Sequence, residues 1–336
     1  MALTVAVTGP TGEIGKPLLA ALERSDAVER VIGMARRPFD PDSEGWTKTE
    51  YRQGDILDRG AVDALVEGAD VVVHLAFVIF GSHEETRRVN LEGTRNVFEA
   101  VAGADSPRLV YTSSVAAYGF HQDNPQPLTE DVAPRGTEGF YYSAQKAELE
   151  SLLADTLADA ATETYVFRPC VVAGRTATML VEQAVKQVRL GGRLPVVERA
   201  LSAVPLLRPV LPGSGVPFQL VHHDDVADAL EAAIAGRGQP GVYNLAAPGE
   251  VTLADIARAL GWYSVPVPDL AVRLAADVAS RLSFVSAELE WANVIKVPVL
   301  METAKARREL GWEPLHDAHE TLLQTVEGAR AAGILG

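Results

Sequence analysis

The opening of the chain constrains its fold more than any other stretch, because a glycine-rich turn stands between a strand pattern and a helix pattern. Leu3–Val7 is an apolar run that fits a buried strand, and Pro17–Leu22 has the apolar density of a packed helix. The turn between them is Thr8-Gly9-Pro10-Thr11-Gly12-Glu13-Ile14-Gly15. A glycine triplet alone predicts only a loop, but a preceding strand and a following helix favour a ligand-binding turn.

Each glycine of this turn has a role of its own. Gly9 permits a tight turn, Gly12 lets backbone amides approach a ligand, and Gly15 lets the helix lie close on the sheet. The N-terminus of the helix offers N–H groups and the positive end of a dipole to a pyrophosphate. The residues expected to bind a dinucleotide here are Gly9, Thr11, Gly12, Glu13, Ile14 and Gly15.

Composition restricts the class of protein. The 336 residues are 47% apolar and 22% charged, which is ordinary for a globular protein of one large or two unequal domains. The formal charge of −15 argues against a nucleic-acid partner, since phosphate binding requires clustered Lys and Arg. A single cysteine, Cys170, excludes an internal disulfide and suits a reducing compartment. With no signal-peptide pattern and no apolar span of bilayer length, we expect a soluble cytoplasmic protein without a membrane partner.

Strand and helix patterns alternate through the first half of the chain. We expect strands at 28–35, 71–76, 109–113 and 165–168, and helices at 61–65, 89–101 and 142–153. Such repeats predict an α/β fold, a Rossmann-type doubly wound parallel sheet whose ligands bind beyond the carboxyl ends of the strands.

After the strand at 165–168 the pattern changes. A segment rich in Gly and Pro suggests a loop-rich lid, and Asp224 and Asp225 indicate the cap of a return helix over 226–234. A strand follows at 242–246, and the tail is mostly helical. The expected domains are a dinucleotide-binding Rossmann domain of residues 1–168 plus about 218–247, and a smaller, mostly helical and discontinuous substrate-binding domain of residues 169–217 plus about 248–336.

The candidate chemistry begins with Tyr142 and Lys146, four residues apart at the start of a helix pattern. This spacing puts both side chains on one helix face, and a nearby ammonium is expected to lower the pKa of the phenol from about 10. Upstream, Thr112-Ser113-Ser114 ends a strand, where a hydroxyl can hydrogen-bond a carbonyl oxygen. Tyr-x-x-x-Lys alone is commonly a surface pair, but with the glycine turn and the strand-end serines it favours proton-transfer chemistry.

Further motifs accompany these features along nearly the whole chain. The set comprises Thr8-Gly9-x-x-Gly12-x-x-Gly15, His74-Leu75-Ala76, Asn90, Ser113-Ser114, Tyr118-Gly119, Tyr142-x-x-x-Lys146, Arg168-Pro169, Val221–Val226 and Leu310–Pro314. On these motifs the chain resembles the extended short-chain dehydrogenase/reductase family, also described as NAD-dependent epimerase/dehydratase-like. That family includes nucleotide-sugar epimerases and dehydratases, hydroxysteroid dehydrogenases and dihydroflavonol-type reductases. The motif set is specific for the family and poorly specific for the substrate.

The resemblance implies a role for each matched residue. Tyr142 would be the acid/base, and Lys146 would also bind the nicotinamide ribose. Ser114 would be the catalytic hydroxyl with Ser113 in reserve, and Asn90 would support the geometry of the site. A homodimer is also implied. The further cofactor positions are Asp55 and Ile56 beside the adenine, Leu75, Ala76 and Phe77 along the dinucleotide, and Arg168, Pro169 and Val171.

One departure from the family pattern concerns the cofactor. Members that prefer NAD usually carry an acid after the second strand, about twenty residues beyond the last glycine, which accepts the ribose hydroxyls. Ala35 takes that place here, and Arg36 and Arg37 follow it. Losing a carboxylate and gaining guanidinium groups suits a 2′-phosphate, so we expect NADP in preference to NAD. The alternative is that both arginines are simply solvated.

A second departure concerns the substrate. Nucleotide-sugar members often have asparagine three residues after the arginine of the Arg-Pro motif, and Val171 stands there instead. The segment Phe77–Gly81 is apolar, which suits a substrate with more carbon surface than a sugar diphosphate, unless these residues are ordinary core. Arg189, Arg193 and Arg208 oppose this interpretation, since any of them could clamp a phosphate. The expected substrate contacts are Phe77, Val78, Phe80, Ser114, Phe120 and Arg208.

Taken together, the residues predict an oxidoreductase that transfers a hydride between a nicotinamide and a carbonyl or alcohol carbon of a fairly apolar small molecule. One alternative is a nucleotide-sugar 4-epimerase or dehydratase with tightly bound NAD. Another is a non-catalytic NAD(P)-sensing protein, against which the intact Tyr142/Lys146 pair counts. We expect no metal site, because His222 and His223 are adjacent on an extended pattern, where neighbouring side chains point to opposite faces.

Overall fold

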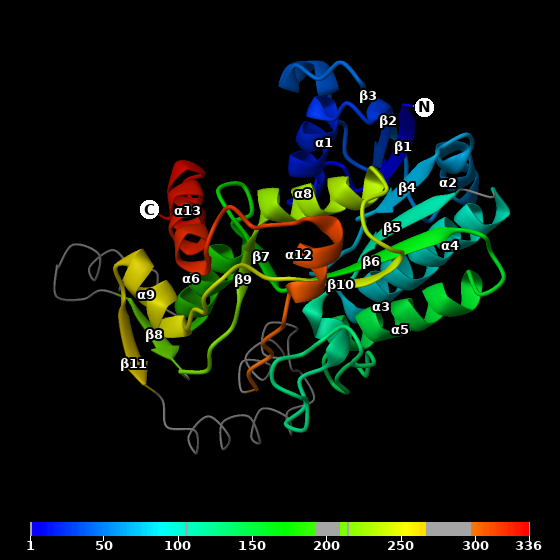
Figure 1. Cartoon of the computed structure of the whole chain (residues 1–336). Helices are drawn as coiled ribbons and strands as arrows, with labels where there is room; N and C mark the ends of the chain where they lie inside the picture. The colour runs from blue at the N-terminus through cyan, green and yellow to red at the C-terminus, as the bar shows by residue number, and fades with distance from the viewer. Residues whose placement is uncertain (1, 105–106, 192–208, 214, 267–296, 336) are drawn as a thin grey trace. The chain divides into compact units, whose positions relative to one another are not determined.

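Seven strands form one parallel sheet in the computed structural model of the chain (Figure 1). They are β1 (Leu3–Thr8), β2 (Val28–Ala35), β3 (Thr49–Gln53), β4 (Val71–His74), β5 (Arg108–Thr112), β6 (Glu163–Pro169) and β10 (Gly241–Leu245). Their spatial order is β10-β6-β5-β4-β1-β2-β3, so the direction of strand addition reverses between β1 and β4. Every neighbouring pair is parallel, which brings all the carboxyl ends to one edge.

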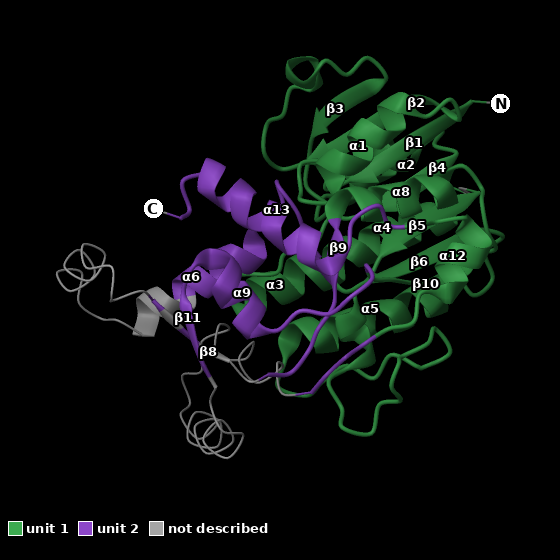
Figure 2. Cartoon of the chain, turned by 60° about the vertical axis from the view of Figure 1, so that its left-hand side comes forward, with its two compact units in different colours: residues 1–170, 223–246, 301–313 green, residues 171–222, 247–300, 314–336 purple. Residues whose placement is uncertain are grey.

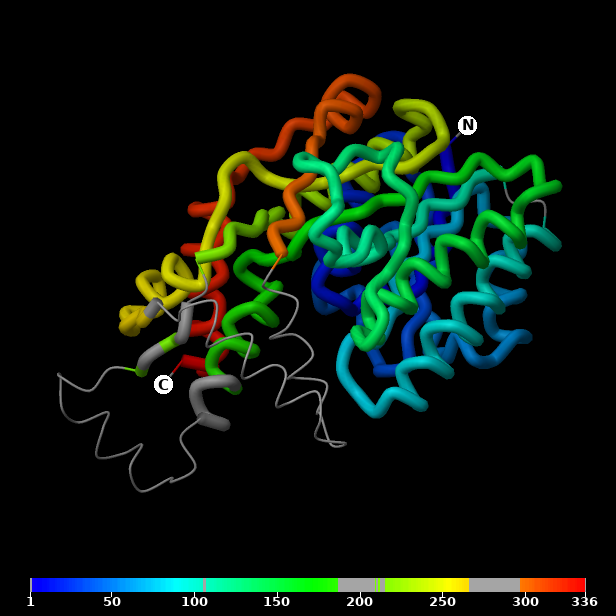
Figure 3. The backbone as a smooth tube through the Cα atoms, turned by 90° about the horizontal axis from the view of Figure 1, so that it is seen from below, coloured from blue at the N-terminus to red at the C-terminus, as the bar shows by residue number. Residues whose placement is uncertain are grey.

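Helices cover both faces of this sheet. On one face lie α1 (Gly15–Arg24) and α8 (His223–Ile234), which pack together, and α12 (Ala304–Leu310) packs on α8 and β10. On the other face α2 (Arg59–Val66), α4 (Gly93–Gly103) and α5 (Tyr141–Thr156) lie side by side (Figure 3). Shorter helical turns are α3 (His83–Arg87), η1 (Pro41–Glu44), η2 (Arg88–Glu92) and η3 (Val115–Tyr118). The arrangement confirms the expected doubly wound Rossmann-type sheet.

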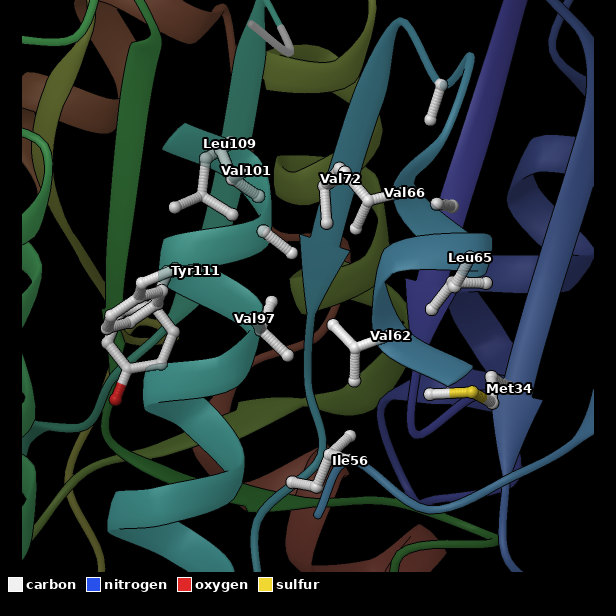
Figure 4. Close-up of a cluster of buried hydrophobic side chains, with 14 of the residues drawn as sticks. Met34, Ile56, Val62, Leu65, Val66, Val72, Val97, Val101, Leu109 and Tyr111 are labelled. Atoms are coloured by element: carbon white, nitrogen blue, oxygen red, sulfur yellow. The ribbon is translucent and has the colours of Figure 1, made fainter. Parts of the chain in front are cut away.

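The face that carries α2, α4 and α5 is built on a continuous apolar core (Figure 4). The strands contribute alternate residues to this face, and the helices contribute residues three and four apart. Burying one such side chain contributes about 1.5–3 kcal/mol, so the core fixes these helices firmly against the strands. The members labelled in Figure 4 are Met34, Ile56, Val62, Leu65, Val66, Val72, Val97, Val101, Leu109 and Tyr111.

The chain divides into two compact units, coloured separately in Figure 2. Unit 1 holds the sheet and comprises residues 1–170, 223–246 and 301–313, and unit 2 comprises residues 171–222, 247–300 and 314–336. The segment 301–313 differs from the expected boundary, since Nε1 of Trp312 donates to the carbonyl oxygen of Asp225 in unit 1 at 2.7 Å. The structure describes residues 2–104, 107–191, 209–213, 215–266 and 297–335.

The described part of unit 2 combines three helices with two pairs of short parallel strands. Its elements are the helices α6 (Met179–Gly191), α9 (Leu253–Leu260) and α13 (Ala318–Ala331), and the parallel strand pairs β7 (Val171–Ala173) with β9 (Leu220–His222) and β8 (Val210–Gly213) with β11 (Tyr263–Pro266). Thr252 and Asp255 form a capping box that starts α9, and an apolar cluster joins the three helices. Within the described ranges, no helix combines the length and the apolar composition that a membrane crossing needs.

Where the elements depart from the sequence-based expectation, the cause is physical. The helix expected at 89–101 begins as the π-helical turn η2 and continues as α4. The sequence gives no apolar run for β3, because β3 is the edge strand and most of its side chains are exposed or partly exposed. Asp224 and Asp225 are not caps, because α8 begins at His223. Both carboxylates lie in the first turn of the helix, where they interact favourably with the positive end of the helix dipole.

Gly15→Ala is expected to destabilise unit 1, because a Cβ there would lie 2.2 Å from the carbonyl oxygen of Gly9. Overpacking of this kind costs about 1–3 kcal/mol, which would appear as a lower midpoint in urea unfolding. Gly103→Ala is the matched control, since Gly103 ends α4 and its added Cβ would have no atom within 4 Å. Equal midpoints for the two variants would contradict the close approach at Gly15.

Candidate active site

The glycine turn leaves β1 and enters α1 at the carboxyl edge of the sheet. Gly9 has a φ of +74°, and a Cβ there would lie 2.9 Å from the backbone nitrogen of Ala76. Among the described residues, a Cβ on Gly12 would meet only the carbonyl oxygen of Gly9, at 3.4 Å. Ile14, at the N-cap of α1, makes no side-chain cap. Gly9 and Gly15 therefore serve the packing of the turn, while Gly12 borders open space, as a pyrophosphate site at a helix N-terminus requires.

A buried hydrogen-bond relay lies behind this turn. Thr8 Oγ1 bonds with Nδ1 of His74 at 2.7 Å, and Nε2 of His74 bonds with Oγ1 of Thr94 at 2.9 Å. The backbone nitrogen of Ala76 donates to Thr8 Oγ1 at 3.4 Å. Burial, with a smaller effect from the charge of Lys146, lowers the pKa of His74 to about 3, so the imidazole is neutral. His74 thus joins β1, β4 and α4 just behind the glycine turn.

Three consecutive residues at the end of β5 hold three successive turns of α5. The contacts are the side-chain hydrogen bond between Ser114 and Tyr142, the donation from Lys146 Nζ to the carbonyl oxygen of Thr112 at 3.0 Å, and the donation from Ser113 Oγ to Glu150 Oε1 at 2.5 Å. Tyr142 is half-buried and the other side chains of this set are buried. The structure therefore brings together four of the five expected catalytic residues.

The phenol of Tyr142 does not titrate as the helix spacing predicts. Burial raises the pKa of Tyr142 above its ordinary value of 10, and the hydrogen bond with Ser114 offsets only part of this rise. The expected lowering by Lys146 is therefore wrong for this structure, because desolvation of the phenolate dominates. At neutral pH the hydroxyl of Tyr142 therefore keeps its proton.

Lys146 is enclosed by aromatic rings. Its Nζ lies 4.0 Å from the ring centroid of Phe77 and 5.4 Å from that of Tyr111. Burial lowers the pKa of Lys146 to about 7, and the carboxylate of Glu150 acts in the opposite direction. The amine is therefore charged below pH 7 and loses its charge as the pH rises above 7.

Asn90, on η2, holds the segment that follows β4. Its Oδ1 accepts from the backbone nitrogen of Val78 at 2.8 Å, and its Nδ2 donates to the carbonyl oxygen of Val78 at 2.9 Å. Nδ2 also donates to Oε1 of Gln145 at 2.8 Å. Asn90 thus ties this segment to the first turns of α5, which carry the candidate chemistry.

Aromatic side chains surround Tyr142. Phe77 packs edge-on against it at 5.5 Å between ring centroids, and Phe140 lies at 6.0 Å. Phe120 packs on Phe140 at 5.8 Å. Residues 75–80 are all half-buried. Of the expected substrate contacts, the structure therefore gathers Phe77 and Ser114 at Tyr142, Phe120 behind Phe140, and Val78 and Phe80 on the same half-buried segment.

Glu150 is a charged residue of the site that the sequence analysis did not single out. It forms a buried ion pair with Arg168, whose Nε donates to Oε1 at 2.9 Å and whose Nη2 donates to Oε2 at 2.5 Å. Nη1 of Arg168 donates to the carbonyl oxygen of Val132 at 3.3 Å, and the guanidinium lies 4.4 Å from the ring centroid of Tyr118. All three nitrogens of Arg168 are thus engaged, which leaves its expected cofactor contact without support. In the sequence, the feature that could have identified Glu150 is its spacing of four residues from Lys146, which places both side chains on one face of the helix.

Arg36 and Arg37 follow β2 at the carboxyl edge, and both are exposed. The hydroxyl of Tyr51 lies within hydrogen-bonding reach of the carbonyl oxygens of Ala35 and Arg37, which fixes the backbone here. In the part of the chain that the structure describes, neither guanidinium forms an ion pair or hydrogen bond. Both cations are therefore available to an anion at the end of β2.

The other expected cofactor residues have mixed surroundings. Asp55 Oδ1 accepts from the backbone nitrogen of Leu57 at 3.0 Å, and Ile56 is buried in the core beside α4. Pro169 ends β6 in unit 1, whereas Val171 begins β7 in unit 2. The positions of these four residues do not by themselves identify a contact with a cofactor.

Two further sequence-based expectations concern arginines and histidines in the second half of the chain. Arg193 and Arg208 lie outside the described residues. His222 ends β9 and His223 begins α8, so the two histidines do not share one extended segment, and the alternation of side chains along a strand does not apply to them.

The chain is similar to known proteins over most of its length. The protein "Uncharacterized protein y4nG" of Sinorhizobium fredii is 27% identical over 330 residues, which are 96% of this chain and 77% of that protein. The protein "Uncharacterized protein Rv2047c" of Mycobacterium tuberculosis is 29% identical over 324 residues, 95% of this chain, but the match spans 29% of that longer protein.

Solved structures share the fold. The crystal structure of UDP-glucuronic acid 4-epimerase from Bacillus cereus in complex with NAD has a TM-score of 0.72 at 17% identity, covering 98% of this chain and 99% of that chain. Residues 5–246 match the family described as "NAD dependent epimerase/dehydratase family". This match spans well over half of the sequence and confirms the resemblance seen in its motifs: the chain belongs to the NAD-dependent epimerase/dehydratase family, within the extended short-chain dehydrogenases/reductases.

Proposed function

We propose that this chain is an NAD(P)-dependent oxidoreductase that transfers a hydride between the nicotinamide and a carbonyl or alcohol carbon of a fairly apolar small molecule. The observation that carries the proposal is the hydroxyl pair of Tyr142 and Ser114, held at the carboxyl edge of the sheet and flanked by half-buried aromatic residues. When bound, the nicotinamide gives or takes the hydride. Binding, orientation and proton transfer come from the residues of the chain.

The glycine turn is the proposed pyrophosphate site, because a Cβ on Gly12 would border open space while Gly9 and Gly15 are packed. Asp55 and Ile56 are proposed beside the adenine, since they follow β3 at the same edge. Leu75, Ala76 and Phe77 are proposed to line the dinucleotide, and Lys146 to bind the nicotinamide ribose. Support for these assignments comes from the family membership, from the position of the glycine turn and of residues 55–56 and 75–77 after strands, and from the hydrogen bond of Lys146 to the end of β5.

Proton transfer is assigned to Tyr142. The raised pKa keeps its hydroxyl protonated at neutral pH, which is the form that donates a proton to a carbonyl oxygen. Ser114, whose hydroxyl bonds with Tyr142, is proposed to hold that same oxygen. The hydroxyl of Ser113 donates a hydrogen bond to Oε1 of Glu150, so Ser113 is not needed as a catalytic hydroxyl. The arrangement therefore supports carbonyl reduction at neutral pH.

The proposed substrate is apolar around the reacting carbon. Phe77 and Phe140 pack around Tyr142, so apolar rings form part of the wall beside it. Because a buried polar group without a partner is costly, such walls favour a carbon-rich substrate over a sugar diphosphate.

NADP is the proposed cofactor form. Arg36 and Arg37 are exposed at the end of β2, and neither guanidinium has a partner in the described part of the chain. Guanidinium groups match the geometry of a phosphate, and Ala35 offers no carboxylate that would repel it.

A nucleotide-sugar 4-epimerase with tightly bound NAD is the second candidate, favoured by the description of the family. An epimerase of this kind regenerates its cofactor in each cycle and has no need to release it. A non-catalytic NAD(P)-sensing role is less well supported, because Tyr142 and Ser114 are held in contact.

Tyr142→Phe is expected to lower turnover of an active ketone substrate about 10²–10⁴-fold, because the proton donor is lost. Cofactor binding, measured by quenching of intrinsic fluorescence, should be retained. Tyr141→Phe is the matched control on the same helix, since the hydroxyl of Tyr141 donates to the carbonyl oxygen of Ile79. Unchanged turnover in Tyr142→Phe would contradict the proposed mechanism.

Arg36→Ala is expected to weaken NADPH binding about tenfold while leaving NADH binding nearly unchanged, because one charge-assisted contact to the 2′-phosphate is lost. Isothermal titration of both cofactors measures the ratio. Arg30→Ala is the control, since Arg30 lies on β2, the strand that precedes Arg36, and is paired with Glu50. Tighter NADH than NADPH binding in the parent protein would overturn the NADP assignment.

Mass spectrometry of the purified and dialysed protein separates the two candidate functions. A reductase that exchanges its cofactor should emerge without bound nucleotide and should need added NADPH for activity. Retained NAD at about one molecule per chain, with activity on a nucleotide sugar and no added cofactor, would instead establish the epimerase.

A further inference from the structure

Glu150 occupies a position that the proposed mechanism does not use. It lies on α5, one turn beyond Lys146, and its side chain is buried. Both of its oxygens are fixed, because Arg168 donates to each of them and Ser113 donates to Oε1. The carboxylate of Glu150 is therefore held in place from β6 and from the residue after β5, one helical turn beyond Lys146.

The surroundings of Lys146 explain why such a carboxylate matters. Nζ donates to the carbonyl oxygen of Thr112 and lies over the ring of Phe77, and neither group carries a charge. An ammonium removed from water is destabilised strongly unless an opposite charge lies near. The titratable and charged groups around it are Tyr142 and Glu150 on α5, His74 on β4, Tyr111 on β5 and, through Glu150, Arg168 on β6.

Of these groups, Glu150 is the one that favours the charged amine. His74 is neutral, since burial lowers its pKa to about 3, and Tyr111 is also kept uncharged because burial raises its pKa. Arg168 is itself a cation and cannot stabilise a second one. The carboxylate of Glu150 opposes the effect of burial on Lys146.

We propose that Glu150 is a positioning residue that stabilises the protonated form of the buried amine of Lys146, an inference that rests on the proposed function. A protonated Lys146 holds its hydrogen bond to the end of β5 and presents a cation at the site assigned to the nicotinamide ribose. Glu150 touches neither substrate nor cofactor in this scheme, and acts only through Lys146.

The competing explanation is that Glu150 serves only as the counter-ion of Arg168. A buried ion pair needs both partners, so removing either one alone is destabilising whatever its effect on Lys146. The double variant Glu150→Gln/Arg168→Met separates the two explanations, because it removes the buried pair as a unit. If Glu150 served only Arg168, this variant would leave the titration of Lys146 as it is in the parent protein.

The test is the titration of Lys146 in the full chain without added cofactor, followed by NMR of selectively ¹³C-labelled lysine and assigned with Lys146→Arg. We expect the midpoint to fall by about one pH unit or more in Glu150→Gln and to fall also in the double variant. Glu148→Gln is the matched control, since Glu148 lies on the same helix, is exposed and pairs with Arg87. Its midpoint should equal that of the parent protein.

A midpoint in the double variant equal to that of the parent would overturn the proposal. This readout needs no substrate, so it can fail while Tyr142→Phe still abolishes turnover, or hold when that variant does not. Where turnover is measurable, its alkaline limb should move to lower pH in the double variant, because an amine with a lower pKa loses its charge at lower pH. An unmoved limb would also count against Glu150.

Discussion

The docking of α5 on the carboxyl end of β5 is the interaction on which the rest of the site depends. Thr112, Ser113 and Ser114 are consecutive on the chain. Their respective partners are Lys146, Glu150 and Tyr142, which lie four residues apart along the helix. A strand end that turns into η3 presents one carbonyl and two hydroxyls at different angles, and the helix meets them with one face. Neither element alone fixes the positions of the phenol and the amine.

Burial determines the protonation states of these side chains and also destabilises the charge on Lys146. The same desolvation that keeps Tyr142 protonated destabilises the charge on Lys146 and makes His74 neutral. The site therefore contains a compensating carboxylate, and that carboxylate needs its own partner, Arg168. The ion pair behind the site follows from placing an amine where water does not reach, and it explains why a charged network lies in the centre of an apolar sheet.

The fold and the placement of Tyr142 and Lys146 on one helix could be predicted from the sequence, because their signals are local. The strand at 28–35 has its expected bounds, since a run of buried residues marks it, and the glycine turn is fixed by its neighbours. β3 could not be predicted, because an edge strand needs no apolar run. The role of Arg168 and the pKa of Tyr142 were also beyond the sequence, because both depend on burial and on partners that arrive from other elements.

The same coupling determines where such a site can vary. Inserting or deleting one residue in α5 would turn the following side chains about 100° around the helix and separate at least one of them from its strand-end partner. The half-buried segment at residues 75–80 is attached differently, through Asn90 and the aromatic contacts of Phe77. Phe77 of this segment packs on Tyr142 and Lys146, but none of the three contacts to the end of β5 is made by a side chain of the segment. Substrate preference is therefore expected to reside in that segment, while the proton-transfer residues stay fixed by the register of one helix on one strand.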